Sequence, residues 1–240
     1  MILQKIPPMT APDTEGVVLA AVDEPFVDLA AFSGGRVLVD MQYKKQGRPG
    51  ATDRALLRRG AAERLLKAAN ALPKGYRLLV YDAWRPYAVQ KDIYDEYFKA
   101  VAEDPENRGL TDDALHALTA RFVSRPARGK PLSFVHSSGG AVDLTLADEQ
   151  GRPLDMGCGF DEFTPLAATN ALENANTPAR DNRRLLYTVM INAGFTNYAA
   201  EWWHFDFGDL FYAAETKTAA RYASIYDEGE ITYDKSAPSL

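Results

Sequence analysis

The spacing of apolar positions along the chain predicts helices and strands that are interleaved. In residues 53–72, leucines and alanines recur at the spacing of one helix face. Asp53 can cap the first turn of this segment, and Pro73 and Gly75 end it. Similar patterns recur elsewhere between capping and stop residues. The predicted helices are residues 53–72, 87–102, 111–123, 181–193 and 216–225.

Short runs rich in apolar and β-branched residues predict the strands. These runs are residues 17–21, 36–41, 77–82, 141–147, 152–155, 195–198 and 203–207. Residues 148–151 have a turn sequence and join two of the runs as a hairpin. We therefore expect one α+β domain over residues 1–240, with a loose lead-in at 1–30, a long loop at 161–176 and an extension at 209–240.

Composition and charge narrow the classes of function. The 240 residues are 46% hydrophobic and 25% charged, which is ordinary for a globular protein. A net charge of −6 without any basic run argues against a nucleic-acid partner. No run approaches the roughly 20 apolar residues of a membrane span, and no signal segment is visible, so we expect a cytoplasmic protein. The single cysteine, Cys158, cannot form an internal disulfide.

The first motif that can carry chemistry runs from His136 to Asp143. Gly139 and Gly140 follow the histidine and allow a tight turn, and Asp143 then lies within an apolar strand. An aspartate in such a strand is costly unless it is paired or bound to a metal. Zinc accepts a carboxylate among histidines. A turn aspartate beside a core histidine is the alternative interpretation.

The second motif is the segment Glu201-Trp-Trp-His204. A catalytic zinc needs three protein ligands, an open position for water and a base beside that water. Positions i and i+3 of a regular strand face opposite ways, so Glu201 and His204 can cooperate only across a bulge or at a strand entry. The alternative is an aromatic core strand, with Trp203, Phe205 and Phe207 facing inward and the polar neighbours incidental.

Arg85 follows a predicted buried strand, at a strand end where functional sites are often built. A cation beside zinc could stabilise the oxyanion of a tetrahedral intermediate. A surface salt bridge to Asp82 or Asp92 is the alternative that its position alone favours.

The remaining histidine, cysteine and tryptophans are expected to have lesser roles. His116 lies in a helical pattern and is predicted to be a helix surface or half-buried residue. Cys158 could ligate zinc as a thiolate, but we expect it to line the site passively. Trp203 is expected in the core, and the sequence leaves open whether Trp202 lines the pocket.

Three ordered motifs together resemble the D-alanyl-D-alanine dipeptidase family, which are zinc metallopeptidases best known from vancomycin resistance. The motifs are His-x-x-Gly-x-Ala-x-Asp at residues 136–143, Glu-x-Trp-His at 201–204 and Asp-x-aromatic-Arg-Pro at 82–86. The resemblance covers residues 39–207. It implies an α+β fold with a central antiparallel sheet flanked by helices, and one zinc ion per chain in a confined cleft.

The resemblance also implies roles for particular residues. It implies His136, Asp143 and His204 as zinc ligands, Glu201 as the catalytic base and Arg85 as the electrophilic helper. By the same resemblance, Asp161 and Tyr43 hold the free amino group of the substrate. One position departs from the family, which tends to have a serine two residues before the first ligand, where this chain has Phe134.

The activity implied is hydrolysis of D-alanyl-D-alanine or a related D,D-dipeptide to free amino acids by water that Glu201 activates at the zinc. The expected partner is a small dipeptide, with no nucleic acid and no membrane, and a homodimer is left open. A murein carboxypeptidase or endopeptidase with a similar zinc site is the nearest alternative. A non-catalytic peptide-binding protein and a structural zinc domain are further alternatives, against which the base and the open coordination position argue.

Overall fold

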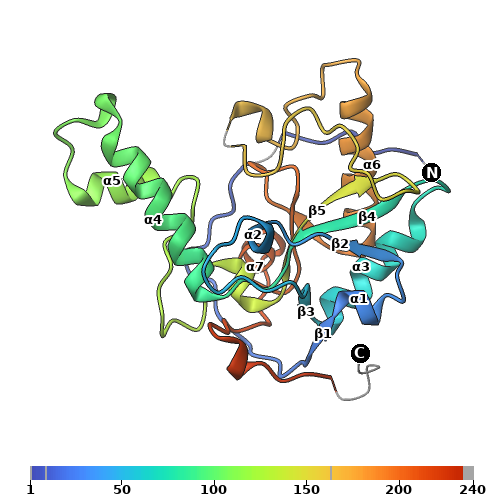
Figure 1. Cartoon of the computed structure of the whole chain (residues 1–240), viewed down its shortest axis with the longest axis horizontal. Coiled ribbons are helices and arrows are strands. Elements are labelled where there is room, and N and C mark those ends of the chain that lie inside the picture. The colour runs from blue at the N-terminus through green and yellow to red at the C-terminus, as the bar shows by residue number, and fades with distance from the viewer. Residues whose placement is uncertain (1, 9, 163, 235–240) are drawn as a thin grey trace.

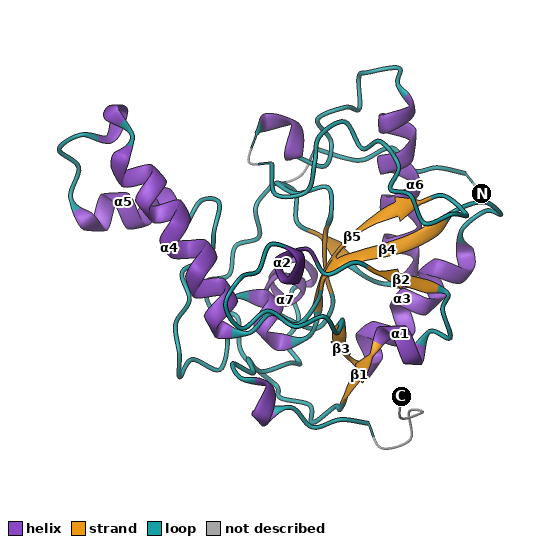
Figure 2. Cartoon of the chain, in the orientation of Figure 1, coloured by secondary structure: helices purple, strands orange, loops and turns teal. Residues whose placement is uncertain are grey.

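A five-stranded sheet lies at the centre of the molecule (Figure 1, Figure 2). The structure, a computed structural model, describes residues 2–8, 10–162 and 164–234. The strands of this sheet, in spatial order, are β2 (Val37–Val39), β4 (Arg77–Asp82), β5 (Ala141–Ala147), β7 (His204–Asp206) and β6 (Thr196–Asn197). A separate two-stranded sheet pairs β1 (Phe26–Asp28) with β3 (Leu56–Arg58).

Helices surround the sheet, and two of them form an arm that projects from the body (Figure 1). The α-helices are α1 (Leu29–Phe32), α2 (Gln42–Lys45), α3 (Arg59–Ala71), α4 (Tyr87–Glu103), α5 (Asp112–Thr119), α6 (Pro178–Ala193) and α7 (Leu210–Thr216). Short 3₁₀ helices cover Pro105–Asn107, Val135–Ser138, Pro165–Ala167 and Glu228–Glu230. The arm consists of α4 and α5. Within the part of the chain that the structure describes, no helix combines the length and apolar character needed to cross a membrane.

The two faces of strand β5 have different neighbours because side chains alternate along a strand. Val142, Leu144 and Leu146 are buried in one core with apolar residues of α3 and α6. Asp143 and Thr145 therefore point to the opposite face of the sheet. The alternation thus directs one buried carboxylate away from the helix-covered core.

Several predicted elements are confirmed, together with the residues that bound them. Strands β4 and β5 have the predicted ranges. Thr111 caps α5 by accepting a hydrogen bond from the Ala114 amide. Gly194 ends α6 in the left-handed conformation, with φ at 104°. The hairpin of β6 and β7 and the turn at residues 148–151 are also present.

The helix predicted over residues 53–72 is wrong in its first part. Residues 56–58 form β3, and α3 begins only at Arg59, so Asp53 does not cap the helix. Leu56 and Leu57 are fully buried in the strand that pairs with β1. Tertiary pairing with a segment far away in the sequence therefore overrides the local helical spacing.

The resemblance implied an antiparallel central sheet, but β2 pairs with β4 in parallel, so the sheet is mixed. The reason lies in the connection between the two strands. It contains α2, β3 and α3, and a crossover of this length lets the chain re-enter the sheet in the same direction.

Predictions near the two ends also need correction. The strand expected at residues 17–21 is reduced to one bridge between Leu19 and Ala220. The lead-in at 1–30 already contains β1. The helix expected at 216–225 lies earlier, as α7, because the Asp209 side chain caps its start and Lys217, with φ at 57°, ends it.

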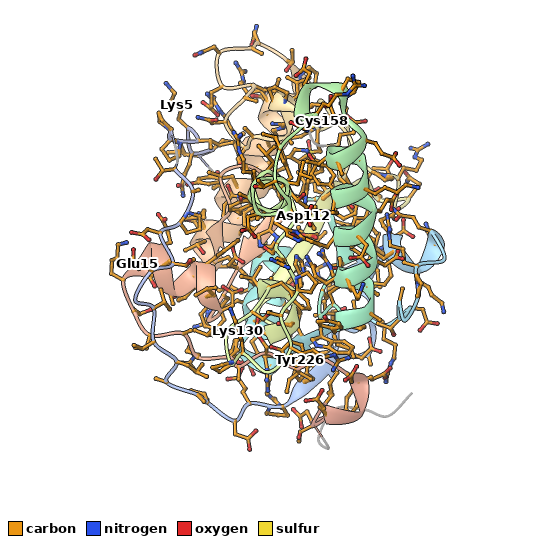
Figure 3. All side chains as sticks on the ribbon, turned by 90° about the vertical axis from the view of Figure 1, so that its left-hand side faces the viewer. Lys5, Glu15, Asp112, Lys130, Cys158 and Tyr226 are labelled. Carbon is orange, nitrogen blue, oxygen red and sulfur yellow. The ribbon has the colours of Figure 1, made fainter. Side chains whose placement is uncertain are left out.

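The extension after residue 209 folds back onto the body. The Trp84 indole nitrogen donates a hydrogen bond to the Ile225 carbonyl (2.9 Å). Tyr226 donates its hydroxyl to the carbonyl of Lys130 (2.6 Å), and Figure 3 shows these two residues close together at one end of the molecule. The extension thereby fixes the loop that follows the arm.

Gly140→Ala is expected to destabilise the fold. A Cβ at this position would lie 2.3 Å from the Phe207 carbonyl oxygen, so the backbone of β5 or β7 must move. We expect a loss of about 1–3 kcal/mol in the free energy of unfolding, the usual cost of overpacking. Urea unfolding with a chelator present measures it. Gly229→Ala is the control, since a Cβ there meets nothing within 4 Å. Equal midpoints for the two variants would contradict this packing argument.

Candidate metal centre

Three polar residues of the site form one row across the central sheet. Asp143 of β5 lies opposite Asp82 of β4 on one side and opposite His204 of β7 on the other. An irregularity in β4 between Val80 and Asp82 sets this register. Paired residues on adjacent strands share a face, so the sheet itself brings the side chains together.

His136 reaches the row from the 3₁₀ helix that precedes β5. Gly139 follows in the left-handed conformation (φ 73°), where a Cβ would lie 2.2 Å from the ring of Phe26. Only glycine fits such a turn. Because of this turn, the chain reverses between His136 and β5, and the His136 side chain lies beside Asp143.

The donor atoms of these residues converge on one point. His136 Nε2 lies 3.1 Å from His204 Nδ1 and 3.3 Å from an oxygen of Asp143. The second oxygen of Asp143 lies 2.9 Å from His204 Nδ1. All three side chains are buried. The structure therefore brings together the three residues that the resemblance implied as ligands.

This donor set fits zinc. Zinc binds imidazole nitrogen and carboxylate oxygen at about 2.0–2.2 Å in a tetrahedron, which places its ligand atoms about 3.3 Å apart. The observed separations of 2.9 to 3.3 Å agree with that arrangement. Two imidazoles and one carboxylate leave the fourth tetrahedral position for water or substrate, which is the pattern of a catalytic site.

Hydrogen bonds orient both imidazoles. His204 Nε2 lies 2.8 Å from Asp206, and His136 Nδ1 lies 2.8 Å from the carbonyl of Ala83. Each ring can therefore keep a proton on its outer nitrogen and direct the other nitrogen toward the point where the donor atoms converge.

The electrostatics of the row favour a charged Asp143. Burial acts to raise its pKa, but His136 and His204 prevail and hold the pKa of Asp143 well below its usual range. Burial likewise opposes a charge on His204, yet Asp206 and Asp143 raise its pKa well above the ordinary value. A carboxylate that stays ionised and faces two imidazoles is ready to bind a cation.

Glu201 lies beside this donor set and not within it. Its carboxylate is 3.9 Å from His204 Nδ1, and β7 begins only at His204. The predicted strand entry is therefore confirmed. Burial raises the pKa of Glu201 to about 8, and a divalent cation nearby would lower it. A carboxyl poised in this way can accept and return a proton near neutral pH.

Arg85 forms the salt bridge to Asp82 that its position alone favoured, but both residues are buried, so the expected surface location is wrong. Its Nε donates to Asp82 (2.8 Å), Nη1 to Gln90 (2.7 Å) and Nη2 to Asp143 (3.3 Å). Burial opposes the charge, but Tyr43 and the two carboxylates keep the pKa of Arg85 above its ordinary value. The guanidinium is thus a fixed cation beside Asp143 of the donor set.

Asp161 and Tyr43 form a pair at another part of the site. The Tyr43 hydroxyl donates to Asp161 over 2.9 Å. Asp161 has a left-handed backbone (φ 58°), a conformation that few residues other than glycine adopt. Burial raises the pKa of Asp161 to about 7. A substrate ammonium would lower that pKa again, because opposite charges stabilise each other.

The seven predicted site residues line one cavity of about 110 Å³. They are Tyr43, Arg85, His136, Asp143, Asp161, Glu201 and His204. The arm supplies part of its wall through Ile93 of α4, and the segment after α5 adds Ala120 and residues 122–124. Ligand pockets for larger molecules are commonly about 300–1,000 Å³, so the space suits a small substrate.

Other candidates from the sequence lie elsewhere. Cys158 does not join the His136–Asp143–His204 cluster; its sulfur contacts Arg183, and Figure 3 shows it at the opposite end from Lys130. Trp203 is buried in the core, as expected. Trp202 lines a second hollow near Cys158 and not the metal cavity. The half-buried His116 packs on the arm against Phe98, as expected for a helix residue.

Three residues that support the site were not among the predicted site residues. Asp206 orients His204, and because the two are i and i+2 on one strand, their shared face was readable from the sequence. Gln90 links Arg85 to the Ser124 carbonyl of the arm. Tyr198 lines the cavity beside His204. No local pattern signals the last two.

Comparison with known proteins identifies the family. A family model described as D-Ala-D-Ala dipeptidase matches residues 37–222. This range contains the whole metal cluster and most of the fold. The chain therefore belongs to the D-Ala-D-Ala dipeptidase family, and it is a zinc metallopeptidase.

Individual relatives agree with the family match. A D-alanyl-D-alanine dipeptidase of Synechocystis sp. is 33% identical over 181 residues, covering 66% of this chain and 71% of the relative. The enzyme of the same name from Escherichia coli K12 is 34% identical over 155 residues, covering 64% and 67%. A solved structure of VanYB in complex with D-alanine-D-alanine is a remote likeness, with a TM-score of 0.45, 13% identity and coverage of 88% and 93%.

Asp206→Ala is expected to weaken zinc binding without removing a ligand. The variant frees the outer nitrogen of His204, and loss of such an orienting partner typically costs about 10–100-fold in metal affinity. Competition with a chromogenic chelator measures the affinity. Asp104→Ala, an exposed change on the arm, serves as the control, and His136→Ala should lose bound zinc. Wild-type affinity in the Asp206 variant would show that the contact has no orienting role.

Proposed function

We propose that the chain hydrolyses D-alanyl-D-alanine or a related D,D-dipeptide to free amino acids, with zinc held by His136, Asp143 and His204. The observation that carries this proposal is the convergence of these donors with Glu201 in one small cavity. Family membership supports the substrate class.

Glu201 is the base in this proposal. When bound, zinc supplies Lewis-acid activation of water and of the scissile carbonyl. Glu201 accepts a proton from the water as its oxygen adds to the carbonyl carbon. The carbon–nitrogen bond then breaks, and Glu201 returns the proton to the departing amine. Its place beside the donor set, 3.9 Å from His204, suits this transfer.

Arg85 stabilises the negative charge that develops on the carbonyl oxygen. A guanidinium has five N–H bonds. Three are directed at Asp82, Gln90 and Asp143, so two are available to the substrate. Because these contacts fix the group in place, it needs no reorganisation during the reaction.

Asp161 and Tyr43 hold the substrate ammonium. The carboxylate and the phenol converge over 2.9 Å and line the same cavity as Glu201. A buried carboxylate pairs strongly with an ammonium that also loses its water. When the substrate's amino group is held at this position, only a peptide bond close to that group can reach the catalytic residues.

The confined space favours a dipeptidase over a murein carboxypeptidase or endopeptidase. A cavity of about 110 Å³ suits a dipeptide better than a substrate that must extend on both sides of the metal. A non-catalytic peptide-binding role is disfavoured because a buried Glu201 costs stability that binding alone does not require.

We further propose that residues 1–240 act as one catalytic domain, since the main hydrophobic cluster contains residues from Val27 to Tyr222. A cytoplasmic location and a homodimer stay predictions.

The proposal is tested by assaying D,D-, L,D- and L,L-dipeptides and a muropeptide with zinc-loaded protein. We expect D-alanyl-D-alanine to be cleaved, the muropeptide to resist, and a chelator to stop the reaction. Preferential cleavage of the muropeptide would favour the murein alternative. Absence of hydrolysis of every dipeptide would refute the proposal.

Glu201→Gln is expected to keep zinc and the fold but lower kcat by about 10²–10⁴-fold, because the amide cannot accept the proton. Metal analysis and thermal unfolding establish that the site is intact. Glu106→Gln on the exposed arm is the matched control. Near-normal turnover in Glu201→Gln would remove this residue from the mechanism.

A further inference from the structure

The cavity has a polar end and an apolar wall. Asp161 and Tyr43 define the polar end. The wall consists of side chains from α4, from the segment after α5, from the segment before the first ligand and from α7. Its apolar members include Ile93, Val123, Phe134, Val135 and Phe211. A dipeptide has a charge at each end, so the two ends meet different surroundings.

Acidic groups outnumber basic ones around this cavity. Among the described residues that line it, the carboxylates are Asp143, Asp161 and Glu201, and Arg85 is the one lysine or arginine. The single charge of Arg85 already faces two carboxylates, since it also contacts Asp82. The two charges of zinc with that of Arg85 only balance the three lining carboxylates. The cavity therefore has no excess positive charge for a substrate carboxylate.

Phe134 removes a further polar partner. The family tends to have serine at this position, two residues before His136, and a hydroxyl there could donate to a carboxylate. Phe134, only 3% exposed, lines the cavity at this position instead and has no side-chain donor. Ser124 then offers the one aliphatic hydroxyl among the described lining residues, and it is neutral. A carboxylate buried against this wall would lose its water without gaining an ionic partner.

Two cations flank part of the cavity lining along the chain but are not among the described lining residues. Arg121 and Arg125 flank the lining residues 122–124, and both are exposed. A carboxylate that reached them would remain in water, where such pairs contribute little. They do not supply the partner that the cavity lacks.

We propose that this site recognises the free amino end of its substrate and does not require a free carboxylate at the other end. The inference rests on the proposed hydrolysis and names its substrate class more closely: D-alanyl compounds with a neutral carboxyl terminus are substrates as well. With the amide of D-alanyl-D-alanine, water adds to the first carbonyl, the peptide bond breaks, and D-alaninamide leaves with the proton. Phe134 is the residue that sets this preference.

The test compares kcat/KM of the zinc-loaded protein for three compounds. These are D-alanyl-D-alanine, its C-terminal amide and its N-acetyl derivative. We expect the amide to lie within about threefold of the free acid, because no contact depends on the carboxylate. The N-acetyl compound should be at least about 100-fold poorer, because it cannot pair with Asp161.

Phe134→Ser tests the assigned residue. Restoring a hydroxyl donor should shift the preference toward the free acid over the amide by about tenfold, the effect of one hydrogen bond to a charged group. Phe32→Ser, a matched change in the partly buried Phe32 outside the cavity, should leave the ratio unaltered. The ratio is informative because a general loss of folded enzyme lowers both rates equally.

The outcomes separate this inference from the proposed function. If wild-type protein cleaves the free acid at least about 100-fold better than the amide, the inference is overturned and the dipeptidase proposal stands. An unchanged ratio in Phe134→Ser would overturn the role of Phe134. If none of the three compounds is cleaved, the proposed function itself fails.

Discussion

A buried carboxylate in the middle of a strand is the constraint on which the rest of the structure depends. Asp143 is 2% exposed, and burial of an isolated carboxylate is costly. The imidazoles of His136 and His204 and the guanidinium of Arg85 offset this cost, because they lie 2.9 to 3.3 Å from the Asp143 carboxylate. Those groups come from three distant parts of the chain. The arrangement that stabilises Asp143 is therefore the same arrangement that can bind a divalent cation.

Strand pairing gives this arrangement its precision. The Asp82–Asp143–His204 row is fixed by backbone hydrogen bonds of β4, β5 and β7, so the donors do not depend on mobile loops. His136 is held separately, by a glycine turn and by the Ala83 carbonyl. A rigid donor set of this kind binds a metal with little reorganisation. Arg85, Asp161 and Glu201 lie outside the helices and strands around this donor set, and Tyr43 lies in α2.

Much of the site was predictable because its chemistry follows local sequence. His136, Asp143, His204 and Glu201 lie in short motifs with particular spacing, and the structure places all four in one cavity. Apolar, β-branched runs similarly predicted β4 and β5, and a helical pattern predicted most of α6.

The features that were predicted wrongly or not at all depend on contacts between distant segments of the chain. β3 was mistaken for helix because only its pairing with β1 makes it a strand. The parallel β2–β4 pair and the Gln90–Arg85 contact have no local signature either. The contribution of Ile93 on the arm to the cavity wall likewise has no local signature.

The central claim is that one zinc ion lies between His136, Asp143 and His204 with a coordination position left open. Anomalous diffraction at the zinc edge from crystals of zinc-loaded protein tests it most directly. The account predicts one peak per chain, about 2.0–2.2 Å from His136 Nε2, His204 Nδ1 and an Asp143 oxygen, with no fourth protein ligand. A peak bound to the Cys158 sulfur, or imidazoles of residues 136 and 204 that do not share the ion, would contradict it.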